Sequence, residues 1–457
     1  MVGNRSRLLV VVGLVVAIVG ALPAVSRAAT ATASATARAS DEWPQYAGGA
    51  DHVGVNALDP SFTRTSVTTM HTRWTGDIGG QATSSSPVVA NGIVYVGSAD
   101  GDLDAFNAAG CLDAFSDCEP LWTGHTRNGI YGAPAVDGNT VFVASGDRHL
   151  YAFDARGCGN ATTCAPVWRG WLGSAALTSI AIANGTVYVT NYGGKLLAFA
   201  ASGCGETMCH PRWTGSGAGH STSAAAVSGG FVYFGTYRGL HGHLYAFAAG
   251  GCAAVTCKPV WQASLSGVGF SSPTVARGNL YISSGTFDGG GVIAVFRASG
   301  CGAAECAESW HAVLGDDAPS AAPAVSGSTL LVAAQGSLDP NREGVVEAFP
   351  ADGCGHRACT PTWTGGNFGA GSESAPVVTN GIVLIAKGPA SGVPVDAGVY
   401  AFKASGCGAP NCDPIAFFQV GTAQDYLGSS IAVGEGLLFF ASFDNNRNRS
   451  TLYVLEA

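Results

Sequence analysis

Apolar residues along this chain gather in short runs that are rich in β-branched and aromatic side chains. Runs such as Ile93–Val96 and Phe231–Phe234 are bounded by Gly, Asn, Asp or Ser, a pattern typical of β-strands. No segment repeats its apolar residues every 3.6 positions, so we expect very little helix. Hairpin turns are predicted where residue pairs that accept positive φ follow a run. These pairs are Asn91-Gly92, Asp137-Gly138, Asn184-Gly185 and Asn380-Gly381.

Four kinds of segment recur in a fixed order, about fifty residues apart. The first segment of each repeat is rich in small residues, as at 85–89, and precedes a β-branched strand, as at 93–96. A third run ends in aromatic residues, as at 150–153, and a fourth carries a tryptophan, as at Trp122. Four antiparallel strands repeated at this period predict the blades of a β-propeller. Small residues suit the crowded axis, and we expect each tryptophan to pack between neighbouring blades.

The number of blades follows from the two ends of the chain. Seven units are complete, and three more strands are predicted after Gly428, at 429–433, 437–442 and 451–455. The segment 73–76 is a fourth strand with no first three. An eighth blade built from both termini would close the ring and leave no exposed edge. We therefore predict an all-β fold, a single eight-bladed propeller of four-stranded antiparallel blades over 43–457, whose last blade is closed by an N-terminal strand.

Fourteen cysteines form seven close pairs, each five to seven positions apart. Zinc clusters prefer two to four residues between ligands, whereas these gaps hold four to six. An even number of cysteines at regular spacing, in an oxidising compartment, indicates disulfides, each between the third and fourth strands of one blade. Because the closed loops are short, we expect them to stiffen hairpins rather than hold the ring together. The predicted bridges are Cys111–Cys118, Cys158–Cys164, Cys204–Cys209, Cys252–Cys257, Cys301–Cys306, Cys354–Cys359 and Cys407–Cys412.

The N-terminus has the pattern of a secretory signal. Arg5 and Arg7 precede an apolar run over 8–22, and small residues follow Pro23. This run is shorter than the ~20 residues that a membrane-spanning helix needs. We predict a signal peptide over 1–28 and a disordered low-complexity spacer over 29–42. The mature chain is expected to be secreted or associated with the cell envelope, without a membrane span, and monomeric.

The charge of the chain narrows the classes of partner. Formal net charge is −9, and only 12% of residues are charged. This balance excludes the basic footprint of a nucleic-acid-binding domain and a polybasic membrane patch.

The repeat carries a family resemblance. Trp43-Pro44-Gln45-Tyr46 followed by Gly54, then blades of the form S-x-P-V-V-x-N-G-x-V-Y-V-G-S-x-D-G-x-L-x-A-F, resembles the pyrroloquinoline-quinone-type propeller repeat family. That family includes eight-bladed quinoprotein alcohol dehydrogenases and non-catalytic relatives such as the outer-membrane-assembly propeller lipoprotein. The resemblance implies the fold, but it does not imply an activity, because the repeat motif is structural.

The sequence lacks features that the resemblance associates with catalysis. Enzyme members hold the quinone and a calcium ion beneath a disulfide between adjacent cysteines, and this chain has no adjacent cysteines. It also has no C-x-x-C-H haem motif, and no Glu, Asn or Asp matches the metal ligands of the family. These departures favour a non-catalytic binding scaffold with a protein or glycan partner. A dehydrogenase that uses pyrroloquinoline quinone is the alternative, and we expect neither this cofactor nor a metal.

Loops that lead from one blade to the next differ between repeats, and we expect them to meet at the axial mouth. Binding residues concentrate on such loops of a rigid scaffold. The alternative, that these are only divergent surface loops, stays open. The candidate binding residues are Gln81, Arg127, Asn128, Tyr131, His220, Phe270, Asp317, Glu373, Asp425 and Tyr426.

Overall fold

A computed structural model describes residues 42–82, 84–111, 117–267, 271–285, 290–314, 321–334, 345–366, 374–387, 397–420 and 425–457. These residues belong to one compact unit over 38–457. The predicted signal peptide and almost all of the predicted spacer lie outside the described residues. Phe270, Asp317 and Glu373 also lie outside them, as does the side chain of Asp425.

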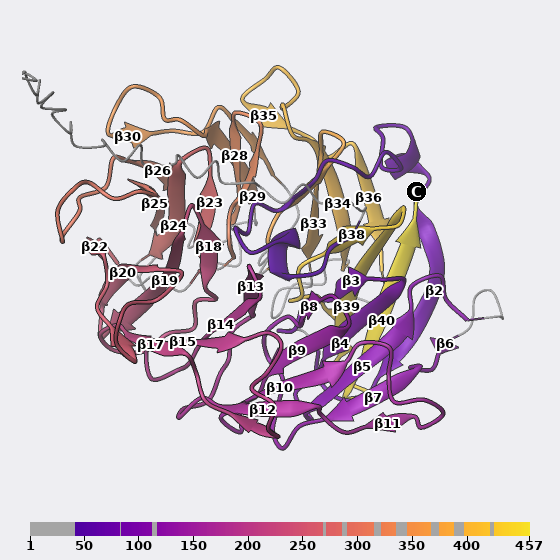
Figure 1. The fold of residues 1–457 in the computed structure, drawn as a ribbon. Coiled ribbons are helices and arrows are strands. Elements are labelled where there is room, and N and C mark those ends of the chain that lie inside the picture. The colour runs from indigo at the N-terminus through magenta and orange to yellow at the C-terminus, as the bar shows by residue number, and fades with distance from the viewer. Residues whose placement is uncertain are drawn as a thin grey trace, which may run out of the picture. The chain divides into compact units, whose positions relative to one another are not determined.

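The chain forms eight sheets, each built on a four-stranded antiparallel blade, and all except the sheet of blade 4 carry one or more short additional strands (Figure 1). Blades 1 and 2, from the axis outward, are β3 (Val88–Ala90), β4 (Ile93–Gly97), β5 (Asp102–Asn107) and β7 (Trp122–His125), then β8 (Ala135–Asp137), β9 (Thr140–Ala144), β10 (His149–Asp154) and β12 (Trp168–Trp171). Blades 3 and 4 are β13 (Ala181–Ala183), β14 (Thr186–Thr190), β15 (Lys195–Ala200) and β17 (Trp213–Ser216), then β18 (Ala226–Ser228), β19 (Phe231–Arg238), β20 (His241–Ala248) and β22 (Trp261–Leu265).

The second half of the ring repeats this order. Blades 5 and 6 are β23 (Thr274–Ala276), β24 (Asn279–Gly285), β25 (Gly291–Arg297) and β26 (Trp310–Leu314), then β27 (Ala324–Ser326), β28 (Thr329–Ala334), β29 (Val345–Pro350) and β31 (Trp363–Gly365). Blades 7 and 8 are β32 (Val377–Thr379), β33 (Ile382–Lys387), β34 (Gly398–Lys403) and β36 (Ala416–Gln419), then β38 (Ala432–Gly434), β39 (Leu437–Asp444), β40 (Arg449–Glu456) and β2 (His71–Ile78). A short strand, β37 (Asp425–Tyr426), also pairs with β39.

The ring closes as predicted, through a blade made from both ends of the chain. Strand β2 pairs antiparallel with β40, with Trp74 opposite Val454 and Gly76 opposite Leu452. The innermost strands contact one another in succession, from β3 through β8, β13, β18, β23, β27 and β32 to β38, which contacts β3. The eight-bladed all-β fold is therefore confirmed. Helix in the described part of the chain is limited to two short 3₁₀ turns, η1 (Tyr46–Gly48) and η2 (Ser66–Thr68).

Three of the predicted turns have the expected geometry, and one is displaced. Asn91 and Gly92 both have positive φ, at 55° and 72°, as a two-residue hairpin turn requires. Asp137 instead ends β8, so the loop before Thr140 is Gly138-Asn139, with Gly138 at φ 57°. Glycine at the first central position gives a different tight turn at the same place in the blade.

The repeated tryptophan of each fourth strand packs between blades, as expected. The indole of Trp122 in blade 1 lies against Gly157 and the ring of Phe153, both in blade 2, with ring centroids 6.2 Å apart for the aromatic pair. Equivalent contacts join Trp74 to Gly110, Trp168 to Gly203, Trp213 to Gly251, Trp261 to Gly300, Trp310 to Gly353 and Trp363 to Gly406.

All fourteen cysteines form the seven predicted local disulfides, each between the third and fourth strands of its own blade. Their expected role needs correction, because the hairpins also join blades. In blade 2, β11 (Thr163–Cys164) pairs in parallel with β7 of blade 1, with Cys164 opposite Gly124. The same pairing is made by β6 (Asp117–Cys118) on β2, β16 (Met208–Cys209) on β12, β21 (Thr256–Cys257) on β17, β30 (Ala358–Cys359) on β26 and β35 (Asn411–Cys412) on β31. A single parallel bridge, Gln262 with Glu305, joins blades 4 and 5.

The joint between blades 7 and 8 is built differently. Here the chain termini take the place of a continuous hairpin, and η2 contacts β36, the outermost strand of blade 7. Ala416 of blade 7 pairs with Ala401 at the register position where the other blades carry tryptophan, and Phe417 and Phe418 follow it on β36.

The N-terminal segment 43–56 bonds to all eight blades, in the order in which they follow one another around the ring. In each blade its partner is the second residue of the innermost strand. In seven blades the backbone N–H of that residue donates to the segment. Val89, Val136, Ile182, Val227, Val275, Val325 and Val378 donate in turn to Trp43 O, Pro44 O, Gln45 Oε1, Ala50 O, Asp51 O, Val53 O and Gly54 O. In the eighth blade, Asn56 Nδ2 donates to Val433 O at 2.9 Å.

This segment satisfies the axial edge of the innermost strands. Within this segment, strand β1 (Val55–Asn56) also pairs in parallel with β32. Gly54 has φ 71°, and a Cβ there would lie 2.9 Å from Ala324 Cβ, so no larger residue fits. The segment that carries Trp43 and Gly54 is thus part of the propeller core.

Candidate functional site

A cavity of about 150 Å³ lies on the axis, next to the N-terminal segment. Among the described residues, its walls come mainly from positions just before the innermost strands of every blade except blade 7, together with one residue of η1. The lining residues are Tyr46, Ser84, Ser86, Tyr131, Gly132, Leu177, Thr178, Ser179, Thr222, Ala224, Ser272, Ala321, Gly428 and Ser430.

Serine hydroxyls on this cavity tie neighbouring blades together at the axis. Ser179 Oγ of blade 3 accepts the N–H of Ala133 in blade 2 at 3.0 Å. Ser272 Oγ of blade 5 accepts the N–H of Ala224 in blade 4 at 3.0 Å. A hydroxyl that accepts such a bond still has its own hydrogen to donate. The cavity wall therefore carries hydroxyl donors that are held in place by the blades.

Two further hydroxyl groups distinguish the cavity. Thr222 Oγ1 is buried and has no hydrogen-bond partner among the described residues. An unpartnered buried hydroxyl costs free energy unless water or a ligand satisfies it. Tyr46 lies on the side formed by the N-terminal segment, hydrogen-bonded to the backbone of Ala322 and to Ser430, and its burial raises the pKa of the phenol. The Tyr46 hydroxyl is therefore neutral at physiological pH.

The ring of His52 packs against the ring of Tyr46. The two rings meet edge to face, with centroids 5.2 Å apart. His52 is 1% exposed, and its Nδ1 lies 2.9 Å from Pro273 O. Burial lowers the pKa of this imidazole to about 4, so at neutral pH the ring is uncharged and Nδ1–H donates to the carbonyl.

The described lining of the axial cavity carries no charged side chain. This lining can be compared with what pyrroloquinoline quinone and calcium would need in order to bind. Pyrroloquinoline quinone carries carboxylates, which need cationic or metal partners when they are buried. A calcium ion would need carboxylate and carbonyl oxygens. Among the described residues no cluster of three or more His, Cys, Asp or Glu could hold a metal ion. The cavity walls that the structure describes therefore do not fit the quinone–calcium pair.

The structure separates the binding residues predicted from sequence. Tyr131 lines the axial cavity. Asn128 uses its side-chain Oδ1 to accept the N–H of Gly129 at 2.8 Å, a local turn contact. His220 stacks on Tyr192 with ring centroids 4.6 Å apart. Within the described part of the chain, Tyr131 is the one predicted residue that lines the cavity.

The remaining predicted residues lie elsewhere. Gln81 accepts the N–H of Ala99 through its carbonyl oxygen at 2.7 Å. Asp425 and Tyr426 form β37, opposite Asp444 and Phe443 of β39.

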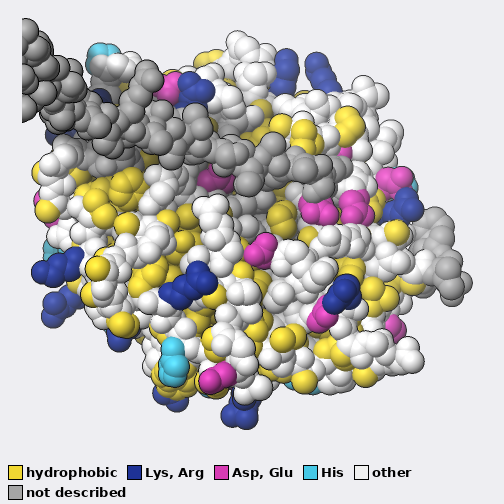
Figure 2. Space-filling model, viewed as in Figure 1, with side chains coloured by type: hydrophobic (Ala, Val, Ile, Leu, Met, Phe, Trp, Pro, Cys, Tyr) yellow, Lys and Arg dark blue, Asp and Glu magenta, His cyan; other side chains and the backbone are white. Residues whose placement is uncertain are grey.

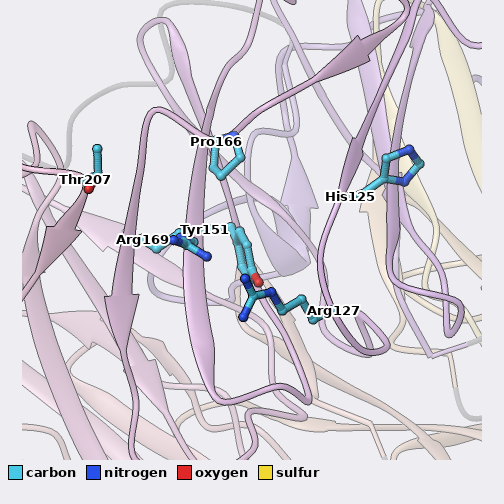
Figure 3. Close-up of a pocket in the computed structure, with 6 residues that line it drawn as sticks. All are labelled: His125, Arg127, Tyr151, Pro166, Arg169 and Thr207. Carbon is cyan, nitrogen blue, oxygen red and sulfur yellow. The ribbon is translucent and has the colours of Figure 1, made fainter.

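Arg127 lines a second pocket, of about 360 Å³, at the joint between blades 1 and 2 (Figure 3). The other lining residues are His125, Tyr151, Pro166, Arg169 and Thr207. Burial, and then the neighbouring Asp147, raises the pKa of Tyr151 to about 12, so the phenol keeps its proton and donates it to Asp147 Oδ2 at 2.5 Å. On the face seen in Figure 2, Lys and Arg side chains are scattered and form no continuous basic surface.

Sequence reasoning missed the hydroxyl lining of the axial cavity. From the sequence, the serines in the small-residue first segment of each repeat are interpreted only as residues that fit a crowded axis. Their recurrence as Ser rather than Ala, as at Ser86 and Ser272, was an available signal. Tyr46 could not be placed by that reasoning, because it lies 38 residues before the nearest other lining residue in the sequence, Ser84.

Comparison with known proteins agrees with this architecture. A family model described as "Outer membrane protein assembly factor BamB" matches residues 65–158. BamB from Moraxella catarrhalis is similar in structure, with TM-score 0.55 and 16% identity over 85% of this chain and 98% of that chain. No curated protein matches the sequence.

Enzymes are also similar in structure, with higher TM-scores and lower sequence identities. Quinohemoprotein alcohol dehydrogenase from Comamonas testosteroni aligns with TM-score 0.62 and 12% identity over 91% of this chain and 80% of that chain. A europium-containing methanol dehydrogenase aligns with TM-score 0.63 and 11% identity over 91% and 98%. In the part of the chain that the structure describes, no helix is long and apolar enough to cross a membrane. The chain is an eight-bladed propeller whose repeats are similar to those of the pyrroloquinoline-quinone-like propeller family.

Proposed function

We propose that this protein is a non-catalytic binding propeller that acts outside the cytoplasm and holds a neutral, hydroxyl-bearing group of a glycan in its axial cavity. One observation carries the proposal. The described cavity wall carries serine, threonine and tyrosine hydroxyls beside glycine, alanine and one leucine, Leu177, and it has no charged side chain. A neutral sugar offers the matching donors and acceptors, together with C–H faces for the rings of Tyr46 and Tyr131.

The size of the cavity supports a small ligand group. Its volume of about 150 Å³ is below the ~300–1,000 Å³ typical of pockets for drug-sized ligands. A terminal sugar of a longer chain is a better match than a free multi-ring cofactor. The unpartnered Thr222 hydroxyl would gain a hydrogen bond when such a group enters.

The location outside the cytoplasm is supported by the disulfides. Seven bridges in one chain are typical of proteins that fold in an oxidising compartment. The signal-like pattern at 1–28 predicts the route of export. Edman sequencing of the chain recovered from the culture fluid or cell envelope should start just after Ala28. A start at Met1 would contradict export by signal cleavage.

The binding proposal is tested by titrating the purified protein with a panel of neutral cell-wall and capsular oligosaccharides in a calorimeter. Thr222→Val removes one hydroxyl without changing side-chain shape, and Tyr131→Ala removes an aromatic face. Each should weaken binding by about tenfold, the loss expected for one hydrogen bond or ring contact at a binding site. Thr140→Val, on β9 and outside the cavity lining, is the matched control and should bind like the natural protein.

Two outcomes would overturn the proposal. The first is that no oligosaccharide in the panel binds to the protein, whereas envelope proteins do. This result would assign a protein partner instead. The second is stoichiometric uptake of pyrroloquinoline quinone with calcium, followed by dye-linked alcohol oxidation, which would assign a dehydrogenase. We expect no uptake and no turnover, because the described cavity wall offers neither cations nor carboxylates.

A further inference from the structure

Blade 2 differs from the other blades at one repeated cross-strand position. There Tyr151 of β10 lies opposite Arg169 of β12. The equivalent pairs in the other blades are Asp104–Thr123, Leu197–Thr214, Tyr245–Gln262, Ala294–His311, Glu347–Thr364, Tyr400–Phe417 and Tyr453–Thr75. Blade 2 alone places an arginine there. A departure from an otherwise structural repeat indicates a site that the fold itself does not require.

A second arginine reaches the same point from the neighbouring blade. Arg127 follows β7 of blade 1, and in Figure 3 its guanidinium and that of Arg169 both extend toward the hydroxyl end of Tyr151. None of the ion pairs between described residues includes either arginine. Arg169 hydrogen-bonds to the Tyr151 phenol, which orients its guanidinium.

The nearby carboxylates already have partners. Asp147 accepts the Tyr151 hydroxyl and contacts His149, and Asp102 pairs with His125 at the pocket edge. Burial raises the pKa of Asp104 to about 7, which reduces its negative charge near neutral pH. The two guanidiniums are therefore available to an incoming anion, although the whole chain has a net charge of −9.

An exposed aromatic ring continues the same surface. Trp171 is two residues from Arg169 on β12, so both side chains lie on the face that meets blade 1. Trp171 is 43% exposed, an unusual position for an indole. The His149 ring lies 4.9 Å from it, and the Arg148 guanidinium lies 5.7 Å from its centroid. The surface thus combines a flat apolar ring with cationic groups.

We propose that the pocket lined by Arg127 and Arg169, together with the exposed Trp171 next to it on β12, binds an acidic saccharide, with a uronate carboxylate on the two guanidiniums and the sugar ring on the indole. A planar guanidinium matches the two oxygens of a carboxylate. The indole offers a flat apolar face to the C–H face of a pyranose. This site lies outside the axial cavity and does not depend on the neutral glycan proposed there.

The test is calorimetric titration of the purified full-length protein with trigalacturonate. Binding should weaken as sodium chloride is raised, because the contact is between charges. Arg169→Gln and Arg127→Gln should each weaken binding by at least about tenfold, and Trp171→Ala by a similar factor. Arg169→Lys should weaken binding less than Arg169→Gln does, but still measurably. Lysine keeps the positive charge but lacks the planar guanidinium that can donate two hydrogen bonds to one carboxylate.

Controls separate this site from general effects. Arg297→Gln, an exposed arginine at the end of β25 in blade 5, should bind trigalacturonate like the natural protein. The thermal unfolding curve of each variant shows whether it folds. Arg127 lies in an exposed connection, so Arg127→Gln is expected to fold and can test the site even if an Arg169 variant does not fold.

Three results would overturn the proposal: no binding of trigalacturonate by the natural protein, equal binding by neutral galactotriose, or equal binding by inorganic phosphate. The two proposals can fail separately. Thr222→Val should leave trigalacturonate binding unchanged, and Arg169→Gln should leave any axial ligand bound.

Discussion

The indole of Trp122 in blade 1 lies directly on the backbone of Gly157 in blade 2. A Cβ at position 157 would be 2.7 Å from the indole Cδ1, closer than any real contact. Gly157 also has φ 87°, a conformation that L side chains rarely adopt. The next residue, Cys158, starts the disulfide hairpin whose strand β11 pairs with the Trp122 strand. Tryptophan, glycine and cystine thus form one joint, which recurs at seven of the eight contacts between blades.

Gly157→Ala should therefore destabilise the protein strongly. Its neighbour Gly159 is a matched control, because it has φ 83° and a Cβ added there would meet no atom within 4 Å. Gly159→Ala should cost about 1 kcal/mol for the backbone conformation alone. Gly157→Ala should cost about 2 to 4 kcal/mol, because the indole must also move. Thermal unfolding of both variants measures the difference, and equal losses would show that the indole contact adds nothing.

Removal of one disulfide should loosen a joint between two blades. The Cys204→Ser, Cys209→Ser double variant opens the hairpin that places β16 on β12 of blade 2. The loop is short, so the chain-entropy loss is about 2 kcal/mol. Hydrogen exchange should rise in β16 and in the facing residues of β12. Glu206→Gln, an exposed change inside the same loop, should leave both stability and exchange unchanged. If hydrogen exchange rises only within the hairpin and not in β12, the disulfide does not help to join the two blades.

His52 should make the N-terminal segment sensitive to acid. Its pKa is about 4 in the folded protein, against an ordinary value of 6.5. The unfolded chain therefore takes up a proton that the folded chain refuses, and stability falls as pH drops from about 6.5 to about 4. In His52→Asn, which tolerates the positive φ of 57° at this position, the melting temperature should fall less over that window. Parallel pH slopes for the two proteins would rule out His52 as the source.

Asp104 should act in the opposite direction. It is 5% exposed, and burial raises its pKa from 3.8 to about 7, with smaller effects from Asp102 and Asp100. The folded protein keeps a proton that the unfolded chain has lost, so stability falls as pH rises from about 4 to about 7. Asp104→Asn removes this charge and can still accept the Thr123 hydroxyl bond, 2.7 Å long in the natural protein. The variant should melt above the natural protein at pH 8 and close to it at pH 4. A lower melting temperature at pH 8 would contradict the buried charge.

The local pattern of the sequence was sufficient for the fold. Strand runs, Asn-Gly turns and the recurring cysteine pairs depend on contacts within one repeat, which sequence spacing records directly. Ring closure was also predictable, because the orphan strand around Trp74 and the three C-terminal strands are complementary. The tryptophan packing between blades followed from its regular place in the repeat.

Contacts between distant repeats required the tertiary structure. The path of residues 43–56 across all eight blades is set by where each innermost strand lies, and no local pattern marks it. The same holds for the two pockets. Arg127 and Tyr131 are four residues apart and were predicted to share one site, but the connection that carries them places Tyr131 at the axis and Arg127 beside Tyr151. Sequence determined the elements, because each blade is held by its own strands and disulfide. Tertiary structure alone decided which side chains meet, because the two pockets lie where separate blades come together.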